Sequence, residues 1–377
     1  MTTVATEAAA SVRERILDAA ERDAHLRIVG RGTWLDANWP VTNAEPLSMH
    51  DISGIMDYVP GDLTLTARAG TTLAELREAT AANRQWLALD PHGSDDGTLG
   101  ATLATASAGP LRTYFGGPRD LTLGVEFVTG AGVIARGGGR VVKNVAGYDL
   151  TRLMIGAWGT LGVITEVTVR LHARPPADES FAVDVDSHTG AGEVRTLLRR
   201  LPFKPYACEV VNAPLARALT GATGAQALFR LGGNAEAVKA QRAALTELGT
   251  VGPMDPSAWT RLRDIEPANA VVFRLSALPS AMDATWRDAA SIVGGASDAF
   301  VHATPALGIV RCIVPTSGGE TTSVLAGLAA ARSTHVAERL PASAWSGAGA
   351  ISDPLSRRVK ATFDPHDRLN PGILGGT

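Results

Sequence analysis

This sequence has very little cysteine and no surplus of either charge. Only Cys208 and Cys312 occur among 377 residues, in no spacing typical of a metal site, and isolated thiols in apolar surroundings are usually core residues. A disulfide between them is the alternative. Lysine and arginine number 35 against 38 acidic residues, a net charge of -3. Because nucleic-acid binding normally shows as a basic excess or stripe, this balance argues against DNA and RNA as partners.

Long apolar runs are missing as well. Residues 1–23 carry acidic and basic side chains throughout and lack the apolar stretch of a secretory signal. No segment approaches the roughly 18 consecutive apolar residues that cross a bilayer. The sequence therefore predicts a cytoplasmic protein without a transmembrane segment, either free or peripheral to the inner membrane through a complex. With 377 residues, 45% of them hydrophobic, the chain is long enough for two globular domains.

The spacing of apolar residues predicts alternating helices and strands. The helices expected first are 7–22, one near 50–57 and one that opens at Gly70, and the strands are 26–29, 63–67 and 163–171, with a hairpin over 125–135. A linker is expected at Arg174-Pro175-Pro176. Beyond it, strand-like runs at 181–185, 227–231, 271–275 and 310–314 alternate with helical stretches such as 235–249. This part is typical of a sheet with helices on one face.

Glycine is concentrated where backbone would approach a ligand. Sixteen of the 40 glycines lie between residues 93 and 162, and glycine permits close approach and positive φ. Gly30-Arg31-Gly32-Thr33 follows a predicted strand, where successive backbone N–H groups can cradle a phosphate. A plain tight turn is the alternative. Leu35 stands where the dinucleotide fingerprint has its third glycine, and no Walker lysine follows, so neither of those patterns applies.

A second motif, Gly97-Thr98-Leu99-Gly100-Ala101, predicts the start of a helix of small residues. Free backbone amides at a helix N-terminus bind pyrophosphate, and small residues leave room for a flat cofactor. Tight helix packing is the alternative explanation of the same residues.

Five blocks in this order and spacing resemble one family. They are residues 116–125, Lys143–Asp149, the Gly156-x-x-Gly159-x-x-Gly162-Val-Ile-Thr-Glu run, Lys360–Pro365 and Leu369–Gly372. Together they identify the chain as a member of the PCMH-type FAD-binding family, with the vanillyl-alcohol-oxidase fold. The block Lys143–Asp149 resembles in particular the FAD-binding E subunits of bacterial glycolate oxidases.

This resemblance implies an α+β fold with a PCMH-type, two-subdomain FAD-binding domain at residues 1–172. It also implies an α+β cap or substrate domain at 177–350. A C-terminal segment at 351–377 would return to the FAD domain. The FAD would be non-covalent, since residues 31–34 contain no His or Cys. By analogy the cofactor-binding residues are Gly30, Arg31, Gly32, Thr33, Gly97, Thr98, Leu99, Gly100, Ala101, Ser107, Gly109, Gly162 and Ile164. Ala101 replaces a glycine that is common in the family.

Residues for the chemistry are less evident. Family members that oxidise 2-hydroxy acids often use a cap histidine motif to bind a metal. Here His302 has no neighbouring carboxylate in the sequence, so no metal site is predicted and the residue is interpreted as structural or vestigial. Arg112 and Arg274 are candidate clamps for a carboxylate, with a solvated strand face as the alternative for Arg274. The catalytic base is not identified, and Arg112, Arg274 and His302 are the weak candidates for catalytic residues.

Three functions fit these patterns. The first is an FAD-binding subunit of a glycolate oxidase-like complex that oxidises a small 2-hydroxy acid, with a companion catalytic flavin subunit and an iron–sulfur subunit. The second is a self-sufficient FAD-dependent oxidase or dehydrogenase of a hydroxy acid or alcohol. The third is a structural subunit that keeps the fold without the cofactor.

Overall fold

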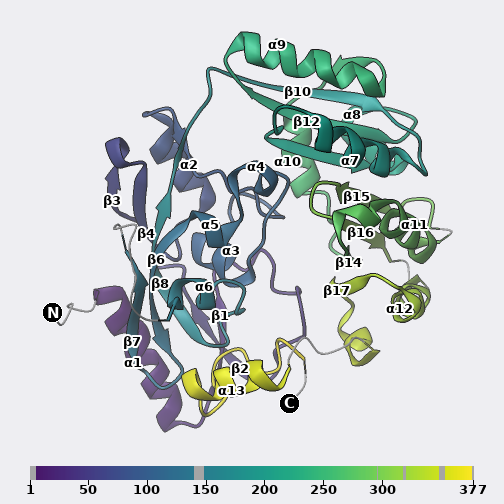
Figure 1. Ribbon diagram of the computed structural model, residues 1–377. Helices are drawn as coiled ribbons and strands as arrows, with labels where there is room; N and C mark the ends of the chain where they lie inside the picture. Colours follow the sequence, from purple (N-terminus) through teal and green to yellow (C-terminus); the bar gives the residue numbers. More distant parts are fainter. Residues whose placement is uncertain (1–5, 140–147, 295, 317–319, 348–352, 376–377) are drawn as a thin grey trace.

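The chain divides around two large antiparallel sheets (Figure 1). The computed structural model describes residues 6–139, 148–294, 296–316, 320–347 and 353–375. The N-terminal sheet has five strands in the order β3-β4-β8-β6-β7, and the later sheet has eight in the order β13-β10-β12-β11-β15-β16-β14-β17. Helices and sheets are mixed throughout, as the α+β prediction requires.

The N-terminal part builds its core around the five-stranded sheet. Its strands are β3 (Ile55–Val59), β4 (Thr64–Arg68), β6 (Thr122–Thr129), β7 (Ile134–Gly138) and β8 (Gly162–Arg170). Two smaller pairs accompany it, β1 (His25–Val29) with β2 (Ala44–Ser48) in parallel and β5 (Gln85–Trp86) with β9 (His172–Ala173). The helices are α1 (Glu7–Glu21), α2 (Leu73–Ala81), α3 (Leu99–Thr105), α4 (Arg112–Phe115), α5 (Pro118–Leu121) and α6 (Leu150–Met154).

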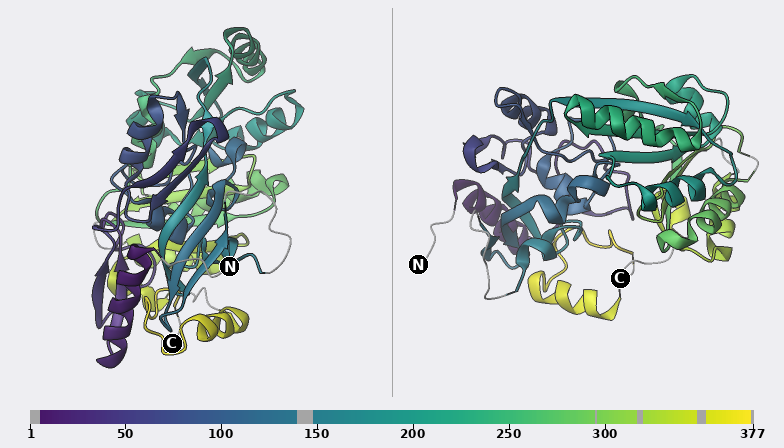
Figure 2. Two further views of the ribbon diagram at one scale, coloured as in Figure 1. Left: turned by 90° about the vertical axis from the view of Figure 1, so that its left-hand side faces the viewer. Right: turned by 45° about the horizontal axis from the view of Figure 1, so that its top comes forward.

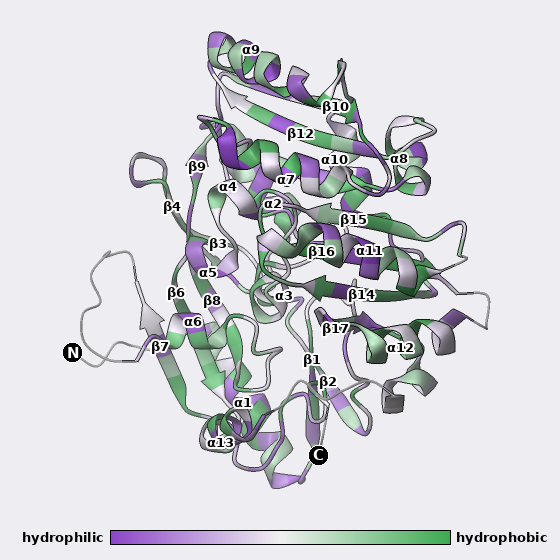
Figure 3. Cartoon of the chain, turned by 45° about the vertical axis from the view of Figure 1, so that its right-hand side comes forward, coloured by the Kyte–Doolittle hydropathy of each residue, from purple (hydrophilic) through white to green (hydrophobic). Residues whose placement is uncertain are grey.

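The second part is the cap. Its strands are β10 (Ala177–Asp184), β11 (Ala207–Val211), β12 (Gln226–Gly233), β13 (Val251–Pro253), β14 (Ala270–Ser276), β15 (Phe300–Thr304), β16 (Ile309–Pro315) and β17 (Thr334–Arg339). Its helices are α7 (Gly190–Arg200), α8 (Ala213–Thr220), α9 (Ala235–Ala244), α10 (Ser257–Arg263), α11 (Met282–Val293) and α12 (Glu320–Ala330). Strands β14 and β16 are mostly apolar, whereas α11, which packs on β16, mixes polar and apolar residues (Figure 3). This amphipathic helix buries Trp286 and Ile292 in the cap core.

Two expectations about these elements are wrong. The helix near 50–57 is instead strand β3, because Ile55 and Val59 are β-branched and Tyr58 pairs across to Leu65 of β4. The cap helices also do not all cover one face. Helices α8 and α10 pack against the opposite face, in a cluster that includes Leu228 of β12 and Trp86 of β5. That face therefore packs on the N-terminal part.

The C-terminal segment returns to the N-terminal part, as predicted. Helix α13 (Pro354–Phe363) lies against the strands and helices of that part and away from the cap (Figure 2). The backbone N–H of Leu26 donates to the carbonyl of Arg368 at 2.7 Å, and the N–H of Asn370 donates back to Leu26 at 2.9 Å. The tail thus extends the edge of β1.

Candidate active site

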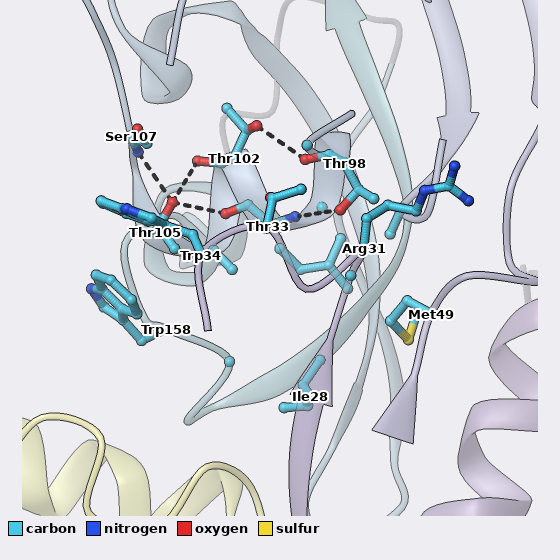
Figure 4. Close-up of a pocket in the computed structure, with 18 of the residues that line it drawn as sticks. Ile28, Arg31, Thr33, Trp34, Met49, Thr98, Thr102, Thr105, Ser107 and Trp158 are labelled. Atoms are coloured by element: carbon cyan, nitrogen blue, oxygen red, sulfur yellow. Dashed lines mark hydrogen bonds between the residues drawn. The ribbon is translucent and has the colours of Figure 1, made fainter. Parts of the chain in front are cut away.

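One cavity, here called the glycine-loop cavity, gathers most of the residues singled out as cofactor-binding. Figure 4 shows Trp34 and Trp158 at one end and Arg31 and Met49 at the other. Its lining includes Gly30, Arg31, Gly32, Thr33, Gly97, Thr98, Gly100, Ala101, Ser107, Gly162 and Ile164. Leu99 does not line it, because its side chain is fully buried in the core, and Gly109 lines a neighbouring cavity instead.

The loop after β1 has the features of an anion cradle. Within the described residues, the backbone N–H groups of residues 30–34 donate no hydrogen bond. Gly32 has a φ of +74°, which an L side chain adopts only with strain. Arg27 and Arg31 also line the cavity. Unpaired amides in a tight loop, with guanidinium groups beside them, favour a phosphate-bearing ligand.

The backbone amides at the N-terminus of helix α3 were expected to be free, but they are already hydrogen-bonded. Leu99 N–H donates to the carbonyl of Thr71 and Gly100 N–H to that of Ala69, both at 2.8 Å. Ala101 N–H donates to the Thr98 hydroxyl at 3.2 Å. These amides are satisfied because residues 69–72 run alongside the start of the helix. Of the two segments predicted to offer amides to an anion, only the glycine loop therefore keeps them unpaired within the described residues.

Several of the glycines are required by packing alone. A Cβ on Gly100 would lie 2.6 Å from Cβ of Ala69, and one on Gly30 would lie 2.6 Å from the Thr98 hydroxyl. A Cβ on Gly109 would lie 2.2 Å from the carbonyl of Asp90, and one on Gly162 would lie 2.8 Å from the Phe127 ring. Substitution at these positions would disturb the fold with or without a ligand.

The tail completes the cavity through Asn370. Its side-chain oxygen accepts from the N–H of Ile28 at 2.8 Å, and its side-chain nitrogen donates to the carbonyl of Trp158 at 2.7 Å. Asn370 has a positive φ of 46°, a conformation that asparagine tolerates. The Leu369–Gly372 block therefore ties β1 to the loop before β8. Residues 143–147 of the Lys143–Asp149 block lie outside the described residues, and Asp149 is the N-cap of α6.

A second cavity adjoins the first. We call it the arginine cavity because several arginine side chains line it. Its volume is about 320 Å³, at the small end of ligand sites. It is lined by Arg112, Arg119, Arg274 and Arg311, with Glu209, Glu338, His92 and His302. Trp34, His92, Thr105, Ser107 and Trp158 line both cavities. The indoles of Trp34 and Trp158 are stacked with their centroids 6.0 Å apart, so aromatic surface marks the junction.

The structure brings all the weak catalytic candidates together here, since Arg112, Arg274 and His302 line this one cavity. Arg274 is only partly solvated, because its side chain is 33% exposed. Its Nε is buried and lies 3.4 Å from Glu338. The statement that His302 lacks a neighbouring carboxylate is wrong in space. Its Nδ1 lies 2.8 Å from Glu209, which is 93 residues away in sequence.

Arg311 is the most firmly held of the charged groups. It is 2% exposed, and it donates from Nη2 to Glu266 at 2.5 Å and from Nε to Glu338 at 2.7 Å. Burial lowers the pKa of Arg311, but the carboxylates of Glu338 and Glu266 outweigh this and raise it above its ordinary value. Burial likewise acts to raise the pKa of Glu338, yet Arg311 and Arg274 lower it overall. Nη1 of Arg311 has no hydrogen-bond partner among the described residues.

Two further groups set the electrostatics of this cavity. Burial, helped by the charge of Arg311, holds the pKa of His92 well below its usual range, so this imidazole is neutral at pH 7. Burial also lowers the pKa of Arg112, with a contribution from Arg274. No hydrogen bond or ion pair engages the Arg112 guanidinium within the described part of the chain. A neutral imidazole beside partly unpaired guanidinium groups suits a small carboxylate.

Other structural findings concern metals, thiols and membranes. Across the residues that the structure describes, no group of three or more His, Cys, Asp or Glu side chains is placed to hold a metal ion. Cys208 and Cys312 are free and buried in the cap core, which confirms the core prediction. No helix within the described ranges is long and apolar enough to cross a bilayer.

Sequence reasoning missed several residues of the site, namely Trp34, His92, Trp158, Glu209, Arg311 and Glu338. Glu209 and Arg311 lie inside strands that look like ordinary core strands. For Glu209 and Arg311 the available signal was a charge within an apolar run, because charges are rarely buried without a partner. Glu338 lies in the mixed edge strand β17 and gave no such signal.

Comparisons with known proteins agree with this geometry. A family model described as FAD binding domain matches residues 2–138. The chain is 31% identical over 373 residues to the glycolate oxidase subunit GlcE of Escherichia coli K12, covering 96% of this chain and 95% of GlcE. It is 28% identical over 186 residues to the glycolate oxidase subunit GlcD of Bacillus subtilis 168, covering 49% of this chain and 40% of GlcD. Among solved structures, p-cresol methylhydroxylase matches with a TM-score of 0.75 at 16% identity, covering 98% of this chain and 88% of that one.

These likenesses define the class of protein. The fold is that of PCMH-type flavoproteins, as predicted. The chain belongs to the family of FAD-binding oxidoreductases that includes GlcE. The residues present also fit FAD, because the unpaired amides of the glycine loop suit a pyrophosphate and the cavity runs from there to aromatic surface at Trp34 and Trp158. When bound, FAD supplies the capacity to accept a hydride.

A partly buried acid that packs against Gly109 gives a pH-dependent prediction. Burial raises the pKa of Asp90 to about 7, against the opposing hydrogen bond from Leu111 N–H at 3.0 Å. The folded state therefore holds a proton that the unfolded state releases near pH 4, so this group costs stability increasingly as the pH rises to about 7. We expect Asp90→Asn to gain stability over wild type by about 2 kcal/mol more at pH 8 than at pH 5.

Denaturant unfolding at both pH values measures this difference, with Asp62→Asn, at an exposed carboxyl, as the control. A stability difference between Asp90→Asn and wild type that is the same at pH 5 and pH 8 would contradict the assignment.

Proposed function

We propose that this protein is the FAD-binding subunit of a glycolate oxidase-like complex that oxidises a small 2-hydroxy acid. The observation that carries the proposal is the shared wall of the two cavities, which includes Trp34, Ser107 and Trp158. A flavin whose pyrophosphate lies on residues 30–34 would bring its ring to this junction. The ring would then adjoin the arginine cavity, where cationic side chains suit a substrate carboxylate. The contacts of Gly30–Thr33, Ala101, Ser107 and Ile164 with FAD are part of this proposal.

The partners rest on the relatives. GlcE and GlcD are both named as subunits of glycolate oxidase, which supports a companion flavin subunit for this chain. An iron–sulfur subunit that takes up the electrons, and a cytoplasmic location for the complex, complete the proposal. We also propose that the FAD-binding domain ends at residue 172 and that the cap domain spans residues 177–350.

A second candidate is a self-sufficient oxidase or dehydrogenase of a hydroxy acid. The arginine cavity favours it, because Arg112, Arg274, Arg311 and His302 already stand beside the proposed flavin position. The third hypothesis, a subunit without the cofactor, is decided by whether purified protein carries flavin.

The test begins with acid precipitation of the purified protein. We expect all the yellow colour in the supernatant, since residues 31–34 offer no His or Cys for a covalent bond. Colour in the pellet would contradict the non-covalent assignment, and His92 would be the imidazole to examine. Absence of flavin, even after incubation with FAD, would refute the proposed function.

Turnover then separates the first two candidates. Glycolate and D-lactate oxidation with an artificial acceptor is measured with the chain alone and with subunits that co-purify from its host. We expect steady-state turnover to require the companions. A lone chain that turns over at roughly 1 per second or faster would favour the self-sufficient enzyme.

A further inference from the structure

The imidazole of His302 is held at one edge and unpartnered at the other. Its Nδ1 lies 2.8 Å from Oε2 of Glu209, whose Oε1 accepts from the Thr304 hydroxyl at 2.5 Å. Glu209 is fully buried and His302 is 5% exposed. A carboxylate that accepts from both neighbours places the ring proton on Nδ1, and this leaves the lone pair on Nε2.

The free edge of the ring belongs to the arginine cavity. Nε2 is buried and has no hydrogen-bond partner within the described residues, while His302 itself lines the cavity. A buried acceptor without a donor is costly, so this arrangement indicates that a ligand supplies the donor. A hydroxyl group is a donor of the right kind.

The groups around His302 indicate what else that ligand carries. The charged and titratable side chains that line the same cavity come from different elements. They are Glu209 from β11, Arg311 from β16, Arg274 from β14, Glu338 from β17, Arg112 from α4, Arg119 from α5 and His92 from the segment before α3. The ring centroid of His92 lies 6.2 Å from that of His302. Nη1 of Arg311 is unpartnered among the described residues. A carboxylate bound by Arg311 and Arg112 would bring an adjacent hydroxyl toward Nε2.

We propose that His302 is the base that removes the hydroxyl proton of the 2-hydroxy acid, and that Glu209 is its positioning residue. This inference rests on the proposed function. The O–H bond would break with its proton passing to Nε2 of His302, and the Cα–H bond would break with its hydride accepted by FAD held in the glycine-loop cavity. The carbon–oxygen bond would become a carbonyl, so the two electrons that the acid loses would be those of the hydride. The imidazolium that forms is stabilised by the carboxylate of Glu209.

His92 does not serve equally well as the base. Its backbone N–H donates to the hydroxyl of Ser107 at 3.1 Å, and no carboxylate holds its ring among the described residues. The Glu209–His302 pair is thus the oriented imidazole of this cavity.

The first test is rapid-mixing reduction of the FAD-loaded full chain by glycolate and D-lactate without oxygen. This half-reaction requires no partner subunit. We expect His302→Gln to slow flavin bleaching by at least about 100-fold, with His172→Gln, outside both cavities, unchanged. Binding of oxalate, which carries carboxylates but no transferable hydride, should persist in His302→Gln and show that the site is folded.

The pH profile and the tautomer test the positioning role. Because only the unprotonated base accepts a proton, the wild-type rate should fall as the pH is lowered, and this acidic limb should be lost in His302→Gln and displaced in Glu209→Gln. Nitrogen NMR of the protein without FAD should find the proton of His302 on Nδ1 in wild type and a mixture of tautomers in Glu209→Gln.

Failure of the inference and failure of the proposed function are distinguishable. A chain that binds no FAD refutes both. A chain that binds FAD and oxalate but is not reduced, a His302→Gln variant reduced at the wild-type rate, or a wild-type His302 with its proton on Nε2 overturns the inference alone.

Discussion

Ala101→Leu is expected to weaken FAD binding by about 10- to 100-fold while the protein stays folded. Ala101 lies in α3, is exposed and lines the glycine-loop cavity, on the side of the helix that faces Gly30. Leucine suits a helix almost as well as alanine, so the added carbon atoms enter the cavity without straining the backbone. This is a cleaner test than Gly100→Val, whose side chain would collide with Ala69 whether or not a cofactor binds.

Titration of the flavin-free protein with FAD, followed by quenching of flavin or tryptophan fluorescence, gives the dissociation constant. Ala10→Leu is the matched control, because Ala10 is an exposed alanine of α1 that lines neither cavity. An unchanged dissociation constant in Ala101→Leu would mean that FAD lies elsewhere. A fall in the melting temperature beyond that of the control would show a fold defect instead.

The predictable parts of this fold were those with a local pattern. Strand β8 and the β6–β7 hairpin have clear alternation and turn residues, and the tail motif around Asn370 is set by its sequence block. Strand β3 was misread because five residues with a glycine before them carry little periodicity. Its pairing with β4, a tertiary contact, decides its conformation.

The site divides in the same way. The glycine loop could be found from sequence because its predicted role depends on the backbone of one short segment. The arginine cavity could not, since Glu209, His302, Arg311 and Glu338 come from four strands whose order in the sheet is not sequential. The motif Gly97–Ala101 was recognised, but its sequence does not show that the amides of α3 are occupied. Their partners lie in residues 69–72, which the fold brings alongside.

Removing the guanidinium of Arg311 is expected to produce the largest loss of stability. Arg311 lies between Glu266 and Glu338, whose side chains are 8% and 16% exposed. Arg311→Met keeps much of the volume but leaves these carboxylates with fewer cations, although Arg339 still lies 3.3 Å from Glu266 and Arg274 3.4 Å from Glu338. Breaking a buried ion pair from one side typically costs about 3–5 kcal/mol.

The pH dependence of this loss identifies its cause. In wild type the pKa of Glu338 is below its ordinary value, so its pairing contributes stability above about pH 4.5, and that contribution disappears as the pH falls further. Without Arg311, burial should raise that pKa, so protonation would relieve the unpaired charge. The deficit of Arg311→Met, measured by denaturant unfolding, should therefore be largest at pH 7 and shrink toward pH 5. Adding Glu338→Gln to Arg311→Met should recover part of it at pH 7, because the amide carries no charge that requires a partner. A deficit that stays constant with pH and is not relieved by Glu338→Gln would trace the loss to packing, and the charge network would then have no part in holding β16 and β17 together.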